Sequence, residues 1–99
     1  MLALKIKSKK NAMYDLECEE IQENFRLFFE FYGTKEPKEG DYIILHKKLL
    51  DRTSELFAQP YAFKICVDKS FDDVKNLNDT EYAIVVSGEE KVILKRIYG

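Results

Sequence analysis

His46 is the only histidine of the chain, so any acid–base chemistry that needs an imidazole must use this residue. It follows an apolar run and precedes Lys47 and Lys48, with no serine or cysteine beside it in the sequence. The members of a catalytic triad can come from distant positions, so the sequence alone leaves such a triad open. We favour a structural or surface histidine, and we predict that the protein is not an enzyme.

Two cysteines, Cys18 and Cys66, are the other candidates for metal binding or nucleophilic chemistry. A zinc site takes about four ligands at short paired spacings, and these two with His46 supply only three distant candidates. We therefore predict two buried, reduced thiols, with no metal and no other cofactor. Segment 1–10 alternates lysine with apolar residues and lacks a signal-peptide core, which together with reduced thiols points to the cytosol.

A third group that could do chemistry is a concentration of carboxylates late in the chain. Its members are Asp68, Asp72, Asp73, Asp79 and Glu81. A calcium loop places oxygen ligands at alternate positions around a glycine, whereas this segment has no glycine and carries Lys69 and Lys75. We interpret it as a solvated acidic helix and turn, in which Ser70 and Asp73 form a helix-capping pair.

The composition sets the scale of the elements that must position these residues. Ninety-nine residues, 45% of them hydrophobic, are enough to close one core, and we treat 1–99 as one small domain. No run approaches the ~20 apolar residues of a membrane-spanning helix, so we expect no membrane association. The net charge of −2 disfavours binding to nucleic acid that is driven by overall charge.

Apolar and polar residues alternate strictly in three successive segments of the first third of the chain. These segments are 2–7, 14–19 and 25–32. Such alternation indicates half-buried strands, and the short polar connections at 10–12 and 20–23 predict a β-meander.

The register of this meander follows from cross-strand pairs. If the first connection is a three-residue loop, Lys5 faces Glu17 and Lys7 faces Asp15. If the second connection is a four-residue loop, Glu17 also faces Arg26. Both choices place opposite charges side by side and keep the apolar residues together, which favours them over a one-residue slip.

The remainder of the chain predicts more strands and one or two short helices. The candidate strands are Tyr42–His46, Tyr61–Val67, Tyr82–Ser87 and Lys91–Ile97. The last two form a hairpin around 88–90, with a loop of either two or three residues. Residues 47–52 are compatible with a short helix or with the end of the preceding strand running into a loop, and a single capped helical turn is compatible with 53–59. A further short helix extends from Ser70 to about Leu77.

The segment Lys38–Leu45 resembles the Gly-Asp turn that enters a central strand of small OB-like and SH3-like barrels. The resemblance rests on Gly40 and Asp41 followed by an apolar run, and it implies an architecture but no function. We therefore predict an all-β fold, a small barrel or rolled antiparallel sheet of six or seven strands of OB-like or SH3-like kind. One or two short helices lie in its connections.

The candidate binding residues lie on the outward face of the meander. They are Lys7, Lys9, Lys10, Met13, Phe28 and Tyr32. An aromatic pair beside lysines on an exposed sheet face can stack unpaired bases and contact phosphates, as in OB-like folds. The competing interpretation, which we favour, is that a later element covers Phe28 and Tyr32 as a second core. The basic strand with Lys91, Lys95 and Arg96 would extend the site if it lay beside the first strand.

These observations predict a non-enzymatic module that binds a protein or peptide through an exposed sheet face or edge. The alternative is an OB-like binder of single-stranded RNA or DNA that uses Phe28, Tyr32 and the nearby lysines. The sequence leaves the oligomeric state open.

Overall fold

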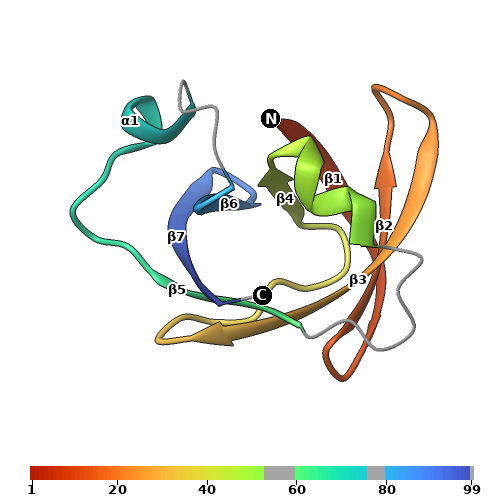
Figure 1. Ribbon diagram of the computed structural model, residues 1–99, viewed down its shortest axis with the longest axis horizontal. Helices are drawn as coiled ribbons and strands as arrows, with labels where there is room; N and C mark the ends of the chain where they lie inside the picture. Colours follow the sequence, from red (N-terminus) through yellow and green to blue (C-terminus); the bar gives the residue numbers. More distant parts are fainter. Residues whose placement is uncertain (53–59, 76–79, 99) are drawn as a thin grey trace.

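The computed structural model describes residues 1–52, 60–75 and 80–98. Their strands form one closed barrel in the order β1-β2-β3-β5-β7-β6-β4 (Figure 1). The strands are β1 (Leu2–Lys10), β2 (Met13–Cys18), β3 (Glu23–Tyr32), β4 (Tyr42–Leu45), β5 (Tyr61–Ile65), β6 (Tyr82–Ser87) and β7 (Glu90–Tyr98). Two short helices, the 3₁₀ helix η1 (Lys47–Arg52) and α1 (Phe71–Lys75), lie in the connections. The predicted all-β barrel is therefore confirmed, although a seven-stranded ring is specific neither to the OB-like nor to the SH3-like kind.

The hairpin of β1 and β2 keeps the predicted pairing at its open end and departs from it near the turn. Lys5 faces Glu17 as predicted. A bulge at Lys7 then puts Ser8 opposite Asp15, so the predicted pairing of Lys7 with Asp15 is wrong. The turn has two residues instead of the predicted three. Its first residue, an asparagine, has a φ of 56°. The extra residue in β1 compensates for the shorter loop and keeps the apolar side chains inside.

β2 and β3 pair two residues away from the predicted register. Arg26 faces Asp15, and the predicted pairing of Arg26 with Glu17 is wrong. The connecting loop runs from Glu19 to Gln22, whose N–H donates to the carbonyl oxygen of Glu19 at 3.3 Å. A shift by two residues leaves every side chain on its predicted face, which is why alternation alone does not exclude it.

The ring closes through a parallel pair, β3 with β5, which the predicted small barrel or rolled antiparallel sheet did not specify. Phe29 lies opposite Tyr61 in this pair, and Tyr32 lies opposite Lys64. Parallel neighbours need a long crossover, which the chain supplies in the connection that contains β4 and η1. As a result, every strand of the ring has a neighbour on both sides.

The inside of the barrel is filled by apolar side chains from all seven strands and from η1. Phe29 is central to this core: it is 2% exposed, and its ring contacts four other aromatic rings. The centroid distances are 5.4–6.4 Å, and the partners are Tyr14, Phe31, Tyr61 and Phe63. The alternation of β3 therefore sends one set of its aromatic residues into the core.

A second, smaller apolar cluster lies outside the barrel, where α1 covers β6 and β7 (Figure 1). Val74 of α1 is fully buried in this cluster, together with Tyr82, Ile84 and Ile93 of the two strands. The ammonium group of Lys91 lies 4.2 Å from the ring centroid of Phe71, at the margin of the same cluster. A helix of five residues thus protects the outer face of one side of the barrel.

Helix α1 begins with the predicted capping pair, which is confirmed. The N–H of Ser70 donates to the carboxylate of Asp73 at 2.8 Å, and the N–H of Asp73 donates to the Ser70 hydroxyl at 3.3 Å. The predicted end near Leu77 lies outside the described residues, as does the helical turn predicted within 53–59. None of the described helices has the length and apolarity needed to cross a membrane.

The predicted strand Tyr61–Val67 is shorter than expected, because β5 ends at Ile65. Ile65 is 41% exposed and Val67 is 86% exposed, so the apolar alternation that predicted the strand does not bury these two side chains. The N–H of Cys66 still donates to the carbonyl oxygen of Ile93 at 2.8 Å, after which the chain leaves the barrel toward α1. The hairpin of β6 and β7 resolves to a two-residue turn, with Gly88 at a φ of 61°.

Candidate binding face on the outside of the barrel

The outward side chains of β3 form the middle of the candidate binding face. Phe28 is 41% exposed and Tyr32 is 48% exposed, whereas Phe29 between them belongs to the core. The interpretation that a later element covers both rings as a second core is therefore wrong. A second core does exist, but α1 places it over β6 and β7, on other strands. We call the two exposed rings, together with the half-buried Met13 beside Phe28, the aromatic patch.

Met13 and then Lys10 lie beside Phe28 on the two neighbouring strands on one side of it. Lys10 is the partner of Met13 in the β1–β2 pair, and Met13 is the partner of Phe28 in the β2–β3 pair. Residues that are directly opposite each other on adjacent strands point to the same face of the sheet. Three of the candidate residues thus form one row across β1, β2 and β3.

Lys9 does not join this row. It lies opposite Tyr14, a core residue, and its ammonium group is 5.4 Å from the centroid of the Tyr14 ring. Lys9 also forms an ion pair with Glu36 from the loop after β3. This hydrogen bond to Glu36 is the main cause that raises the pKa of Lys9 above its ordinary value. The structure therefore places Lys9 at the end of the barrel, on the inner side.

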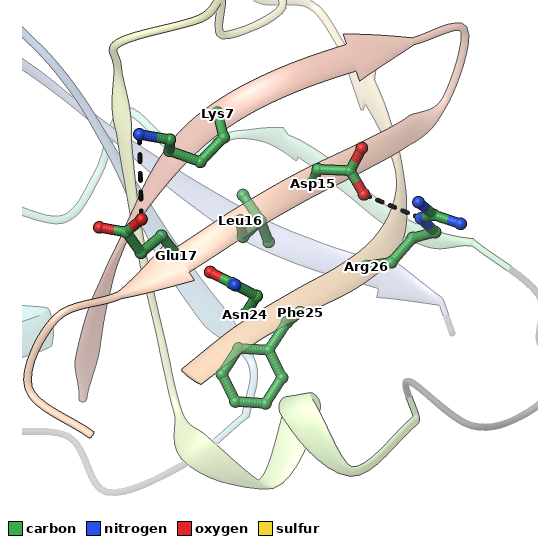
Figure 2. A pocket seen from close by; sticks show the side chains of 7 residues that line it. All are labelled: Lys7, Asp15, Leu16, Glu17, Asn24, Phe25 and Arg26. Carbon is green, nitrogen blue, oxygen red and sulfur yellow. Dashed lines mark hydrogen bonds and ion pairs between the residues drawn. The ribbon is translucent and has the colours of Figure 1, made fainter. Parts of the chain in front are cut away.

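Lys7 lies farther along the outer face, away from the aromatic patch. In this half of the face the cationic and anionic side chains form ion pairs. Its ammonium group is 3.9 Å from the carboxylate of Glu17. On the other side, the guanidinium of Arg26 donates to Asp15 at 2.8 Å, and the carboxylate of Asp15 also accepts a 2.9 Å hydrogen bond from a serine hydroxyl of β1. Figure 2 shows these two ion pairs on either side of Asn24.

This half of the face is hollowed into an open depression of about 600 Å³. It is lined by Lys7, Asp15, Leu16, Glu17, Asn24, Phe25 and Arg26. The two cations and two anions of the lining are paired with one another. The depression therefore offers little net charge to a ligand, in contrast to the row of Lys10, Met13 and Phe28.

Replacing Asp15 by asparagine is expected to reduce the loss of stability in acid. The hydrogen bond from Arg26, and then that from Ser8, lower the pKa of the Asp15 carboxyl. A group with a lowered folded pKa stabilises the fold above its unfolded pKa, near 3.9, and this contribution disappears as the pH falls through the folded pKa. Because the ion pair is exposed, we expect an effect below ~1 kcal/mol.

Urea denaturation of wild-type protein and Asp15→Asn at neutral pH and at about pH 3 measures this difference. The wild-type protein should lose more stability between the two pH values than the variant does. An equal loss in both proteins would contradict the role of the Asp15–Arg26 pair.

Lys64 and Lys95 extend the face beyond Tyr32; the sequence suggested Lys95 only on the condition of another strand order, and it did not suggest Lys64. Lys64 is the partner of Tyr32 in the parallel β3–β5 pair, and Lys95 is the partner of Lys64 in the β5–β7 pair. The condition for the basic strand to extend the site, a place beside the first strand, is not met, because β7 lies between β5 and β6. Only the parallel pairing brings Tyr32 next to Lys64, and no local pattern reports that pairing.

The chain was compared with protein-family models, curated proteins and solved structures. None of them matches.

His46 and Cys66 have structural contacts. His46 is 5% exposed, and its Nδ1 accepts a 3.1 Å hydrogen bond from the N–H of Lys48 in the first turn of η1. Cys66 is half-buried, and not buried as predicted, while Cys18 is fully buried; both are free thiols. Burial raises the pKa of the Cys66 thiol, as does its 3.0 Å hydrogen bond to Asp68. A raised pKa leaves less thiolate and so makes Cys66 a weaker nucleophile.

Across the described ranges 1–52, 60–75 and 80–98, no three or more His, Cys, Asp or Glu side chains gather as a metal site would require. The carboxylates predicted as one acidic segment, between positions 68 and 81, instead make separate contacts where the structure describes them. Asp73 caps α1, and Asp68 accepts a hydrogen bond from the Cys66 thiol.

Proposed function

We propose that this protein is a non-enzymatic binding module that holds a protein or peptide partner on the aromatic patch. The observation that carries the proposal is the exposure of Phe28 and Tyr32, at 41% and 48%, on a strand whose other aromatic side chains are buried in the core or packed against it. Neighbouring exposed aromatic side chains are typical of interaction surfaces, because their burial against a partner gains both apolar area and ring contacts. No cofactor is needed for such a role, and a cytosolic location fits it.

A sheet face supports this function better than a strand edge. Because the ring is closed, each strand already pairs with two others along at least part of its length. Strand addition to an edge needs a continuous row of unpaired backbone groups. The outer face of β3 has no such requirement, since a partner would contact its side chains.

The proposed function is tested by removing the two rings. Immobilised wild-type protein should capture a partner that the double variant Phe28→Ala/Tyr32→Ala retains at least tenfold less well, because central aromatic residues each contribute about 2 kcal/mol or more at interfaces. Tyr42→Ala is the matched control, because Tyr42 is 36% exposed on β4, outside the patch. Equal retention by the double variant would show that the partner binds elsewhere.

A second candidate function is OB-like binding of single-stranded nucleic acid. It is favoured by the lysines beside the rings, since Lys10 shares a row with Phe28 and Lys64 lies opposite Tyr32. Stacked bases and neighbouring cations are the usual features of such sites. This candidate requires an affinity for single-stranded oligonucleotides that falls steeply with added salt.

A further inference from the structure

Lys64 and Lys95 form a pair of like charges on the outer face of the barrel. They lie directly opposite each other on the antiparallel strands β5 and β7. Their neighbours in sequence, Phe63 and Leu94, are fully buried, so the two lysines point outward, and both are exposed. Like charges that face each other across strands destabilise a sheet. We call Lys64 and Lys95 the lysine pair.

Among the described residues, no ion pair joins either member of the lysine pair to a carboxylate. The carboxylate of Asp68 accepts a hydrogen bond from the Cys66 thiol, which is the main cause of its lowered pKa. The charge of Lys95 makes only a smaller contribution to lowering that pKa. On the other side, Glu30 accepts a 2.7 Å hydrogen bond from the hydroxyl of Tyr32. The lysine pair is therefore a place where an external anion would relieve a repulsion within the fold.

We propose that the lysine pair binds carboxylates of an acidic segment of the partner, next to an apolar side chain that packs on the aromatic patch. This inference rests on the function proposed above and specifies the chemistry of the partner. A carboxylate between the two ammonium groups compensates their repulsion, and Tyr32 beside Lys64 supplies apolar contact at the same place. Lys10 beside Met13 offers a second position for a carboxylate, on the far side of Phe28.

The spacing of these features fits an extended peptide. Phe28 and Tyr32 are four residues apart on one strand, which corresponds to ~13 Å at ~3.3 Å per residue. An extended segment that follows β3 would place one apolar residue at each ring. Its acidic residues would then reach the lysine pair at one end and Lys10 at the other.

An acidic peptide fits the charge distribution better than a nucleic acid does. A phosphate backbone needs a continuous positive groove. Here the cations stand apart at the two ends of the aromatic patch, with the carboxylate of Glu30 between the rings. The adjacent row of the face is neutral, because Arg26 is paired with Asp15 and Lys7 with Glu17 (Figure 2).

Synthetic probes test this inference directly on the full chain. The first probe is a peptide of about eight residues in which glutamates surround two phenylalanines, long enough to cover β3 from Phe28 beyond Tyr32. The second has lysine in place of every glutamate, and the third is an oligothymidylate of similar length. We expect saturable binding of the acidic peptide, with changes of the backbone amide NMR signals in β3, β5 and β7, and at least tenfold weaker binding of the other two.

Lys64→Glu is the decisive variant, because it converts the like-charged pair into an opposite pair with Lys95. The melting temperature should rise, while the acidic peptide should bind about fivefold more weakly or worse and the lysine peptide more tightly. A gain in stability together with a loss of binding excludes misfolding as the cause. Lys47→Glu, on η1 away from the patch, is the control and should change neither affinity.

The outcomes separate this inference from the proposed function. If the acidic and the lysine peptide bind equally, and Phe28→Ala/Tyr32→Ala weakens the binding of both, the aromatic patch binds peptides but the inference of an acidic partner is wrong. If the oligothymidylate binds best, with a steep salt dependence, the ligand is a nucleic acid and both proposals fall. If no probe changes the signals of these strands, or Lys64→Glu leaves the acidic peptide unaffected, the lysine pair is not an anion site.

Discussion

Phe29→Ala is expected to lower the free energy of unfolding by about 3–5 kcal/mol, because it removes a ring from the centre of the barrel. Phe29 is 2% exposed and its ring contacts those of four other aromatic residues, so the surrounding side chains cannot all close the resulting cavity. A loss of this size is a large part of the 5–15 kcal/mol that is typical of a small domain. Urea denaturation followed by circular dichroism measures it.

Phe28→Ala is the matched control for this prediction, since it makes the same change one residue away. Phe28 is 41% exposed on the outer face, and we expect its replacement to cost less than ~1 kcal/mol. Similar losses in the two variants would mean that Phe28 is a structural residue, which would remove the main argument for the binding face. A small loss for Phe29→Ala would contradict the described core.

Val74→Asp is expected to lower the free energy of unfolding by more than ~2 kcal/mol, because it places a carboxylate in an apolar cluster without a partner. Val74 is the fully buried residue of α1 and packs against apolar side chains of β6 and β7. Release of α1 would also expose Ile84 and Ile93, so we expect the variant to bind a hydrophobic dye that the wild-type protein does not bind.

Val67→Asp is the control, since it introduces the same charge in the same connection between β5 and β6. Val67 is 86% exposed, and a surface substitution of this kind changes stability by less than ~0.5 kcal/mol. If Val74→Asp were as stable as Val67→Asp and bound no dye, α1 would not protect the second cluster.

Local alternation predicted the parts of the fold that depend on neighbouring segments. It identified the three strands of the meander, the faces of their side chains except beyond the bulge in β1, and the pairing of Lys5 with Glu17. The capping pair of Ser70 and Asp73 was also predictable, because it depends on two residues three positions apart. These features share one property: their partners are close in the chain.

Contacts between distant segments were not predictable in this way. The parallel pairing of β3 with β5 leaves no periodic signal, so the approach of Lys64 to Tyr32 was missed. The position of the second core depends on where α1 folds back, which the pattern of 82–97 does not reveal. The bulge at Lys7 likewise compensates for a shorter turn, and it moves Lys9 to the inner side.

The parallel junction of β3 with β5 has a consequence for the order of folding events. The hairpins β1–β2 and β6–β7 join adjacent segments and can form within about 1–10 μs. The junction, in contrast, must wait for the crossover through β4 and η1, whose closure costs chain entropy before any contact compensates it. Until then, Phe29 and Phe31 lack their partners on β5, and the edge of β3 is open to other chains. The face that we propose for binding therefore lies on a strand whose second edge is protected only by a contact between distant segments.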